Sequence, residues 1–369
     1  MSERPVSLPI PRPAVADPAL TRPNWTTGVP RNPELLWLDK NENGDPAMPA
    51  LAKRILSEID PAILSTYPEC TPLYRKLAAH VGVQPENLLL AAGSDGVIRA
   101  VFEAFVGTGH LVLHTTPTFA MYPVYSRMYG ARTITLEYQP SDAGPSLPAD
   151  RFVEAIREAR PRVVCLPNPD SPTGTVFDPD ALGRIVSAAG DAGALMLIDE
   201  AYYPFYEWTA LPWIASQPHV VLARTFAKAW GVAGLRIGYA IASPPIAKAL
   251  HKVRPMYEVN TVAVAVMERM LDHADELAAS VRRLNEGRDG FRGAMNDLGF
   301  RTLYARGNFL HVAFGEQAPA IHAALADLVL YRKDHNEACL KGFTRFSATT
   351  PERFRPVMAR IRQVVEASR

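Results

Sequence analysis

The most informative stretch of the chain places charged and phenolic side chains just after apolar runs. Asp199 ends one such run, and Tyr202 lies three residues further on. Lys228 comes 29 residues after Asp199, behind a second apolar run, and Arg236 follows eight residues later. If the two runs are parallel strands, their carboxyl ends lie at the same edge of a sheet, where α/β proteins bind ligands. The spacing therefore predicts a site that combines an acid, a phenol, an amine and a guanidinium.

These four groups suit a cofactor with a ring nitrogen, a phenolic oxygen, an aldehyde and a phosphate. Pyridoxal 5′-phosphate (PLP) carries all four. A lysine binds its aldehyde as a Schiff base, and an aspartate keeps its ring nitrogen protonated, so that the ring accepts electrons. Gly231 and Gly234 lie between the lysine and the arginine, where they would allow close approach of the backbone. A lone aspartate or lysine is more often a surface residue, so the combination is what indicates PLP chemistry.

The segments around these residues alternate between buried strands and amphipathic helices. We expect strands at 87–92, 110–114, 132–138, 162–166 and 194–199. We expect helices at 73–80, 96–105, 121–129, 150–160 and 178–189. This alternation predicts an α/β fold with a mostly parallel sheet that is covered by helices on both faces.

The two ends of the chain differ from this middle part. Residues 1–34 are rich in Pro, Arg and Asn, and we expect them to form an extended N-terminal arm. We assign a PLP-binding large domain to 35–255, with 35–50 packing against a smaller α+β domain at 256–369. The expected elements of that smaller domain are a helical tract at 260–298 and segments at 301–314, 321–328, 330–331, 342–347 and 351–367.

Composition excludes several classes of protein. The net charge of +1 over 369 residues gives no electrostatic case for binding nucleic acid or an anionic membrane. No apolar run approaches the roughly 20 residues of a membrane span, and the N-terminus lacks the apolar core of a secretory signal. Cys70, Cys165 and Cys339 match neither a zinc pattern nor a disulfide framework. We therefore expect a cytoplasmic enzyme without a metal.

Further markers support a family resemblance that runs from about residue 38 to the C-terminus. The chain resembles the fold-type I, aspartate aminotransferase-like PLP enzymes, and among them the histidinol-phosphate aminotransferase branch. The markers are the segments 39–43, 67–70, 93–95, 117–122, 172–174, 199–202, 225–228 and 308–309, together with Arg236 and Arg345.

The resemblance implies a role for each residue around the cofactor ring. Lys228 would bind PLP covalently and then move a proton between the substrate and the cofactor. Asp199 would pair with the ring nitrogen, and Tyr202 would donate a hydrogen bond to the phenolic oxygen. Phe119 would stack on the ring.

The phosphate of PLP would be held by a second group of residues. Gly93, Ser94 and Asp95 come between a predicted strand and a predicted helix, so the free N–H groups of the first helical turn can bind an anion. We expect the backbone of Asp95, rather than its carboxylate, to face the phosphate. Thr225 and the fixed positive charge of Arg236 would complete this cradle.

The resemblance also implies substrate contacts and a partner subunit. Arg345 resembles the family's C-terminal arginine, which binds a substrate carboxylate through two parallel hydrogen bonds. Arg332, 13 residues earlier, would help to hold a substrate phosphate. Tyr67 would reach the cofactor phosphate of the neighbouring subunit, which implies a homodimer with shared active sites.

The chain departs from the family pattern at two positions. Ser171 stands where the family usually has an asparagine that donates to the phenolic oxygen of PLP. The serine hydroxyl is shorter, so it would act through a water molecule or leave that function to Tyr202. Gly96 replaces an acidic residue that the branch tends to have. Both departures weaken the inference that the substrate is histidinol phosphate.

The leading hypothesis is a PLP-dependent aminotransferase with ping-pong kinetics. It would move an amino group between an amino acid, either glutamate or an aromatic one, and a 2-oxo acid or imidazole acetol phosphate. A PLP-dependent amino-acid phosphate decarboxylase of the same fold is the alternative, since the sequence does not fix which bond of the α-carbon breaks. A non-catalytic PLP-binding sensor is a third class, but only about 34 residues precede the aminotransferase part, too few for a winged helix.

Overall fold

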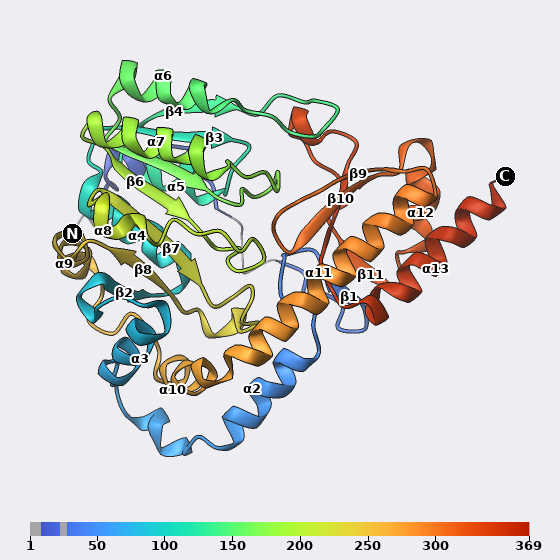
Figure 1. Cartoon of the computed structure of the whole chain (residues 1–369), viewed down its shortest axis with the longest axis horizontal. Helices are drawn as coiled ribbons and strands as arrows, with labels where there is room; N and C mark the ends of the chain where they lie inside the picture. The colour runs from blue at the N-terminus through green and yellow to red at the C-terminus, as the bar shows by residue number, and fades with distance from the viewer. Residues whose placement is uncertain (1–8, 23–27, 369) are drawn as a thin grey trace, which may run out of the picture.

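A seven-stranded sheet forms the centre of the larger part of the chain (Figure 1). The computed structural model describes residues 9–22 and 28–368. The strand order is β2-β8-β7-β6-β5-β3-β4, and β8 runs antiparallel to both of its neighbours while the remaining pairs are parallel. The expected mostly parallel sheet is therefore confirmed. Its strands are β2 (Leu88–Ala91), β3 (Leu111–Thr116), β4 (Arg132–Glu137), β5 (Val163–Pro167), β6 (Leu195–Asp199), β7 (Val220–Thr225) and β8 (Gly238–Ala242).

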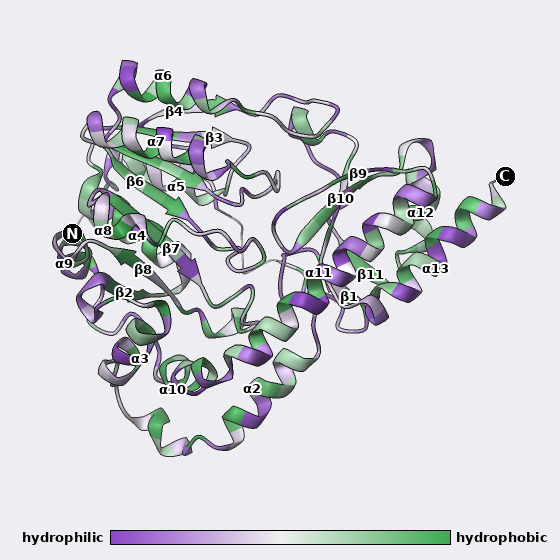
Figure 2. Ribbon diagram, viewed as in Figure 1, coloured by the Kyte–Doolittle hydropathy of each residue, from purple (hydrophilic) through white to green (hydrophobic). Residues whose placement is uncertain are grey.

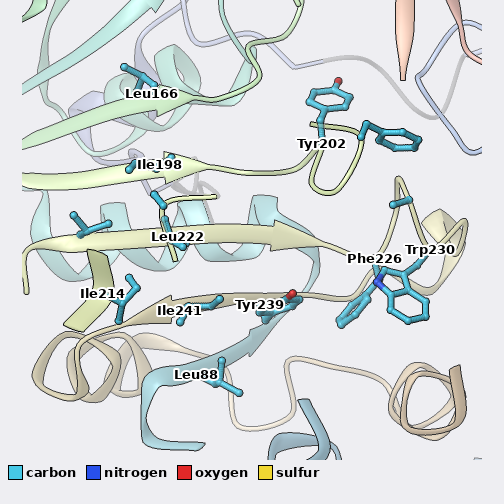
Figure 3. Packing of buried hydrophobic residues seen from close by; sticks show 14 of the residues in the cluster. Leu88, Leu166, Ile198, Tyr202, Ile214, Leu222, Phe226, Trp230, Tyr239 and Ile241 are labelled. Carbon is cyan, nitrogen blue, oxygen red and sulfur yellow. The ribbon is translucent and has the colours of Figure 1, made fainter. Parts of the chain in front are cut away.

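Helices cover both faces of this sheet. Successive residues of a strand point to opposite faces, so Leu197 packs in the cluster formed with α4, α5 and α9, while Ile198 packs in the cluster formed with α6 and α7. Figure 3 shows Ile198, Leu222 and Ile241 side by side on neighbouring strands, within the second cluster. Strands buried on both faces read as continuous apolar runs, which is the pattern in the sequence. The helices are α4 (Gly93–Phe105), α5 (Met121–Met128), α6 (Ala149–Ala159), α7 (Pro179–Asp191) and α9 (Pro244–Val253).

The C-terminal part builds a second core around a smaller antiparallel sheet of order β12-β10-β9. A two-stranded parallel pair, β1 with β11, joins the segment after the arm to this part of the chain. The helix α11 contacts α2 at one end and β9, β10 and α13 at the other (Figure 1). The elements are β1 (Leu36–Leu38), β9 (Arg301–Leu303), β10 (Phe309–Ala313), β11 (Val329–Tyr331), β12 (Thr344–Ser347), α11 (Ala274–Asp297), α12 (Ala318–Ala324) and α13 (Pro351–Ala367). The exact domain limits at 34 and 255 stay predictions.

Several elements differ from those expected. The helical tract at 260–298 consists of α10 (Thr261–Met270) and α11, separated by a 3₁₀ turn, and α10 packs on α2 (Ala47–Ser57) and α3 (Thr71–Val81). The segment 301–314 contains two strands, because the chain reverses between β9 and β10. The arm is not extended throughout, since α1 (Pro13–Ala16) is a short helix that contacts α5. Residues 1–8 and 23–27 of the predicted arm lie outside the residues that the structure describes.

The distribution of hydropathy follows this architecture. In Figure 2 the strands of the large sheet are mostly hydrophobic, while α6, α11 and α13 alternate between hydrophobic and hydrophilic turns, as expected of helices with one buried face. Over residues 9–22 and 28–368, the structure contains no helix that is both long and apolar enough to cross a membrane. Within the same residues, no group of three or more His, Cys, Asp or Glu side chains is arranged to hold a metal ion.

Candidate active site

A cavity of about 440 Å³ lies at the carboxyl ends of β5, β6 and β7. Most of the residues predicted for the site line it, although they come from segments up to about 250 residues apart in the sequence. They are Ser94, Asp95, Phe119, Ser171, Asp199, Tyr202, Thr225, Lys228, Arg236 and Arg345. The position agrees with the rule that α/β sheets bind ligands beyond the carboxyl ends of their strands.

Asp199 is a buried carboxylate whose hydrogen-bond donors, among the residues that the structure describes, are all neutral. It is the last residue of β6; Tyr122 donates its hydroxyl proton to Oδ2 at 3.0 Å, and the backbone N–H of Ala201 donates to Oδ1 at 3.0 Å. Burial raises the pKa of Asp199 to about 6, and these two hydrogen bonds only partly oppose the effect. A cationic N–H in the cavity would stabilise the ionised form, which is what a protonated ring nitrogen supplies.

Lys228 is an amine with a lowered proton affinity. Its Nζ donates to the backbone carbonyl oxygen of Lys40 at 2.8 Å. Burial, followed by the positive charge of Arg345, lowers the pKa of Lys228 to about 8. The neutral, nucleophilic amine is therefore accessible near neutral pH, as covalent binding of an aldehyde requires.

The start of α4 and Arg236 lie side by side at one end of the cavity. Gly93 has a left-handed backbone with φ of +82°, and a Cβ atom at this position would lie 2.7 Å from Nη2 of Arg236. A Cβ on Gly238 would lie 2.8 Å from the backbone nitrogen of Ser94. Both glycines thus allow close packing around the first turn of a 13-residue helix, whose free N–H groups and dipole favour a phosphate.

Two further residues of the predicted cradle line the same end of the cavity. Thr225 ends β7, and its Oγ1 accepts a hydrogen bond from the backbone N–H of Ala227 at 3.1 Å. The Oδ1 atom of Asp95 is buried without a hydrogen-bond partner among the described residues, and burial raises the pKa of this carboxyl. That the backbone of Asp95 faces the phosphate stays a prediction.

Tyr202 lies in the loop beyond β6, and Figure 3 shows its ring past the end of the strand that bears Ile198. The side-chain amide of Asn41 donates to its hydroxyl oxygen at 2.9 Å. Burial raises the pKa of Tyr202, while hydrogen bonds from Ser171 and Asn41 act in the opposite direction. Asn41 belongs to a marker segment, but its role was not predicted, since the sequence does not show that this segment reaches Tyr202.

The two predicted substrate arginines lie in different surroundings. Arg345 of β12 lines the cavity, is buried, and donates through Nη2 to the backbone oxygen of Asp39 at 2.8 Å. Its Nε has no hydrogen-bond partner in the described part of the chain. Arg332 does not line the cavity; its guanidinium lies 3.4 Å from the carboxylate of Glu337 and donates to the backbone oxygen of Asp334 at 3.2 Å. The structure therefore brings one of the two into the site.

Phe119 and Tyr67 also take different positions. Phe119 lines the cavity and packs edge-to-face on Tyr122, with ring centroids 5.9 Å apart. Tyr67 does not line the cavity of its own chain: it is 71% exposed and stacks on Tyr257 at a centroid distance of 4.1 Å. The exposed ring is compatible with a contact to another subunit.

The geometry fits PLP. The end of the cavity lined by Ser94, Thr225 and Arg236 offers donors and a positive charge to a phosphate. Burial raises the pKa of Asp199, which a cationic partner would offset, and Lys228 is a reactive amine. Tyr202 adds a hydroxyl that can donate to a phenolic oxygen. Lys228 and Arg345 line the same cavity, which allows covalent chemistry at one end of an anionic substrate.

Comparison with known proteins gives a consistent result. Residues 33–361 match the family described as aminotransferase class I and II. The chain is 30% identical over 319 residues to the histidinol-phosphate aminotransferase of Caldanaerobacter subterraneus subsp. tengcongensis, covering 85% of this chain and 89% of that protein. It is 34% identical over 303 residues to histidinol-phosphate aminotransferase 2 of Pseudomonas fluorescens, covering 80% of each. A crystal structure of histidinol-phosphate aminotransferase from Sinorhizobium meliloti in complex with PLP superposes with a TM-score of 0.76 at 23% identity, covering 90% of this chain and 91% of that one.

Proposed function

We propose a specific reaction for this chain, which belongs to the class I and II aminotransferase family. The chain is a PLP-dependent aminotransferase with the fold type I of the aspartate aminotransferases, as the sequence markers predicted. It moves an amino group between a small-molecule donor and an oxo acceptor. We infer that the pair is L-histidinol phosphate with 2-oxoglutarate, which yields imidazole acetol phosphate and L-glutamate.

Each residue of the cavity has a separate role in this reaction. When bound, PLP supplies an electron-accepting ring that is conjugated to the substrate amine. Asp199 keeps the ring nitrogen protonated, and Tyr202 donates to the phenolic oxygen. Lys228 would accept a proton at Nζ from the substrate α-carbon and return it to the carbon of PLP that carries the aldehyde group, as a general acid and base.

The observation that carries the substrate proposal is the buried guanidinium of Arg345, which lines the same cavity as Lys228. Its Nε has no hydrogen-bond partner among the described residues, and its planar fork suits an anionic group at the far end of a substrate. Glutamate offers a carboxylate there and histidinol phosphate offers a phosphate, so one arginine serves both half-reactions. The names of the two relatives above favour the phosphate-bearing substrate.

We assign Arg332 to the substrate phosphate as well. The residue lies directly opposite Arg345, because the backbone groups of the two residues exchange hydrogen bonds at 2.8 and 3.1 Å. Its guanidinium is half exposed and its contact with Glu337 is long, at 3.4 Å, so a doubly charged phosphate can compete for it. The proposal requires the side chain to leave Glu337 when the substrate binds.

We further propose a homodimer with shared active sites. Tyr67 stacks on Tyr257, and both rings are exposed, as are the nearby residues in sequence Leu64 and Met256. Exposed apolar side chains of this kind are typical of a protein interface. Tyr67 of the partner subunit would reach the cofactor phosphate. Mixing a Tyr67→Phe variant with a Lys228→Ala variant tests this, because mixed dimers then contain one site with both defects and one with neither. Recovery of activity supports sharing, and no recovery despite proven subunit exchange contradicts it.

Product analysis tests the reaction itself. The PLP-loaded protein is incubated with histidinol phosphate and 2-oxoglutarate, and glutamate is measured. Parallel reactions contain phenylalanine or threonine phosphate as the donor, and released carbon dioxide is measured in each. Glutamate formation from histidinol phosphate supports the proposal. Carbon dioxide from threonine phosphate without glutamate would instead identify a decarboxylase, and glutamate from phenylalanine alone would identify an aromatic aminotransferase.

A further inference from the structure

Asn41 connects the cofactor tyrosine with the strand that carries the substrate arginine. It is 3% exposed, and its Nδ2 lies 2.9 Å from the hydroxyl oxygen of Tyr202. On its other side it contacts Ser347, which is two residues after Arg345 on β12. No role of this residue follows from the reaction described above.

The hydrogen bonds around Asn41 fix the orientation of its amide. The backbone N–H of Asn41 donates to Oγ of Ser347 at 2.8 Å, and that hydroxyl donates to Oδ1 of Asn41 at 3.3 Å. The amide oxygen is therefore used on the side of Ser347, which leaves Nδ2, a donor only, facing Tyr202. Asn308 secures the backbone, because its amide donates to the carbonyl oxygen of Asn41 at 3.0 Å.

The backbone of Asn41 has the left-handed conformation, with φ of +55°. Few residue types adopt it readily; glycine does, and asparagine and aspartate do so more often than the others. The position therefore selects a short side chain that carries an amide or a carboxylate. Only the amide can donate to Tyr202.

A donor facing Tyr202 determines where the tyrosine proton can go. A phenolic hydroxyl has one proton, and its oxygen accepts through its lone pairs. Because Asn41 offers a proton, Tyr202 accepts there, and its own proton is left for the cavity or for Ser171, the other side chain that hydrogen-bonds this hydroxyl. We propose that Asn41 is a positioning residue that makes the Tyr202 hydroxyl donate to the phenolic oxygen of PLP. Asn41 would thus act on the phenolic oxygen indirectly, through Tyr202, in a chain where Ser171 replaces the asparagine that usually donates to this oxygen.

The visible absorption band of lysine-bound PLP reports this hydrogen bond without any substrate. Donation to the phenolic oxygen stabilises the deprotonated form of the lysine linkage. Loss of this hydrogen bond therefore raises the pKa of the linkage, which is measured from the pH dependence of the band. In Asn41→Asp the carboxylate accepts the tyrosine proton and turns it away from the cofactor. Asn41→Gly keeps the left-handed backbone without the amide and without a new charge. We expect the pKa of the lysine linkage to rise in both variants, by about half a unit to one unit in Asn41→Gly and by more in Asn41→Asp.

A double-mutant cycle separates this role from a merely structural one. In a Tyr202→Phe background, Asn41→Gly is expected to leave the pKa of the band unchanged, because no hydroxyl remains to be oriented. Asn43→Ala is the matched control: Asn43 lies on the same segment but donates to Ala229 and Ser280, away from Tyr202, so no shift is expected. Ser347→Ala keeps Asn41 but removes the hydroxyl that orients its amide. This variant should raise the pKa of the lysine linkage by a smaller amount than Asn41→Gly.

The inference rests on PLP binding and not on the proposed acceptor, because no substrate is present in these titrations. An unchanged pKa of the lysine linkage in Asn41→Gly, or an equal pKa shift with and without the Tyr202 hydroxyl, would overturn the inference. If Asn41→Gly does not fold or does not bind PLP, the Ser347→Ala titration decides: no shift there overturns the inference as well. A wrong choice of substrate pair would alter none of these results.

Discussion

The Nζ atom of Lys228 donates a hydrogen bond to the backbone carbonyl oxygen of Lys40 over 2.8 Å, although 188 residues separate them. The preceding carbonyl, that of Asp39, accepts from Arg345 at 2.8 Å. Two neighbouring carbonyl groups of one segment thus hold the amine that we propose binds the cofactor and the guanidinium that we propose binds the substrate. Covalent binding of PLP must replace the first of these bonds, and an anionic substrate must compete with the second.

The rate of PLP binding by the apoprotein should depend on the protonation of Lys228. Its pKa of about 8 lies below the ordinary 10.5, so the neutral amine predominates above pH 8, and the rate should rise with pH through about 8. Glu42 raises this pKa through its negative charge, and Glu42→Gln should therefore move the midpoint to lower pH. Stopped-flow absorbance checks both, with the exposed Glu58→Gln as control. A midpoint near 10.5, or one that Glu42→Gln leaves in place, would contradict this account of the lysine.

Asp199→Asn should stabilise the apoprotein while it abolishes activity. The folded-state pKa of about 6 exceeds the ordinary 3.8, so the favourable contribution of Asp199 is complete below pH 3.8 and is lost as pH rises through 6. At pH 7.5 the ionised, buried form costs up to about 3 kcal/mol, and the variant should recover about 1–3 kcal/mol. Urea unfolding measures this gain, which should shrink as pH falls toward 4. A variant that is less stable than the parent at pH 7.5 would show that Asp199 has no unfavourable charge to lose.

Gly93→Ala should weaken PLP binding by about tenfold or more, since the added methyl group would displace the Arg236 guanidinium, which we propose holds the phosphate. Gly82→Ala is a matched control. Gly82 also has a left-handed backbone, with φ of +76°, but a Cβ atom there meets nothing within 4 Å. Both variants should lose about 1 kcal/mol of stability from backbone strain, and only Gly93→Ala should change the PLP dissociation constant, measured by fluorescence. Equal effects on PLP binding in the two variants would rule out the Arg236 pocket as the phosphate site.

The two arginines should differ in how they affect the two substrates. Arg345→Lys should lower kcat/KM for both glutamate and histidinol phosphate by about a hundredfold, because lysine cannot form two parallel hydrogen bonds. Arg332→Gln should raise KM for histidinol phosphate and leave glutamate nearly unaffected. Steady-state kinetics with each donor test the pair. If Arg332→Gln changes KM for neither donor, Arg332 has no part in substrate binding and only contacts Glu337.

Much of the fold was predictable because its signals are local. The parallel strands are buried on both faces, so they are short apolar runs, and Asp199 and Thr225 end two of them. The antiparallel β8 was not predicted, because direction depends on pairing with β2 and β7, which the sequence does not display. The break between α10 and α11 also escaped prediction, since no proline or glycine marks it.

The site was predictable where one residue type performs one task. Lys228, Asp199, Tyr202 and Arg236 fall in a compact stretch of sequence, and the structure brings all four to one cavity. Asn41 was missed, because its partner Tyr202 is 161 residues away and only the folded chain brings them together. The orientation of Arg332 toward Glu337 could not be foreseen either, since side-chain direction depends on the neighbouring loop.

The most direct test of the proposed reaction is the visible spectrum of the PLP-loaded protein during addition of histidinol phosphate without an acceptor. The band of the lysine-bound cofactor should disappear and the band of pyridoxamine phosphate should replace it, with one equivalent of imidazole acetol phosphate formed per site. Glutamate should cause the same conversion. A band that survives saturating histidinol phosphate but is converted by glutamate and phenylalanine would contradict the proposed substrate.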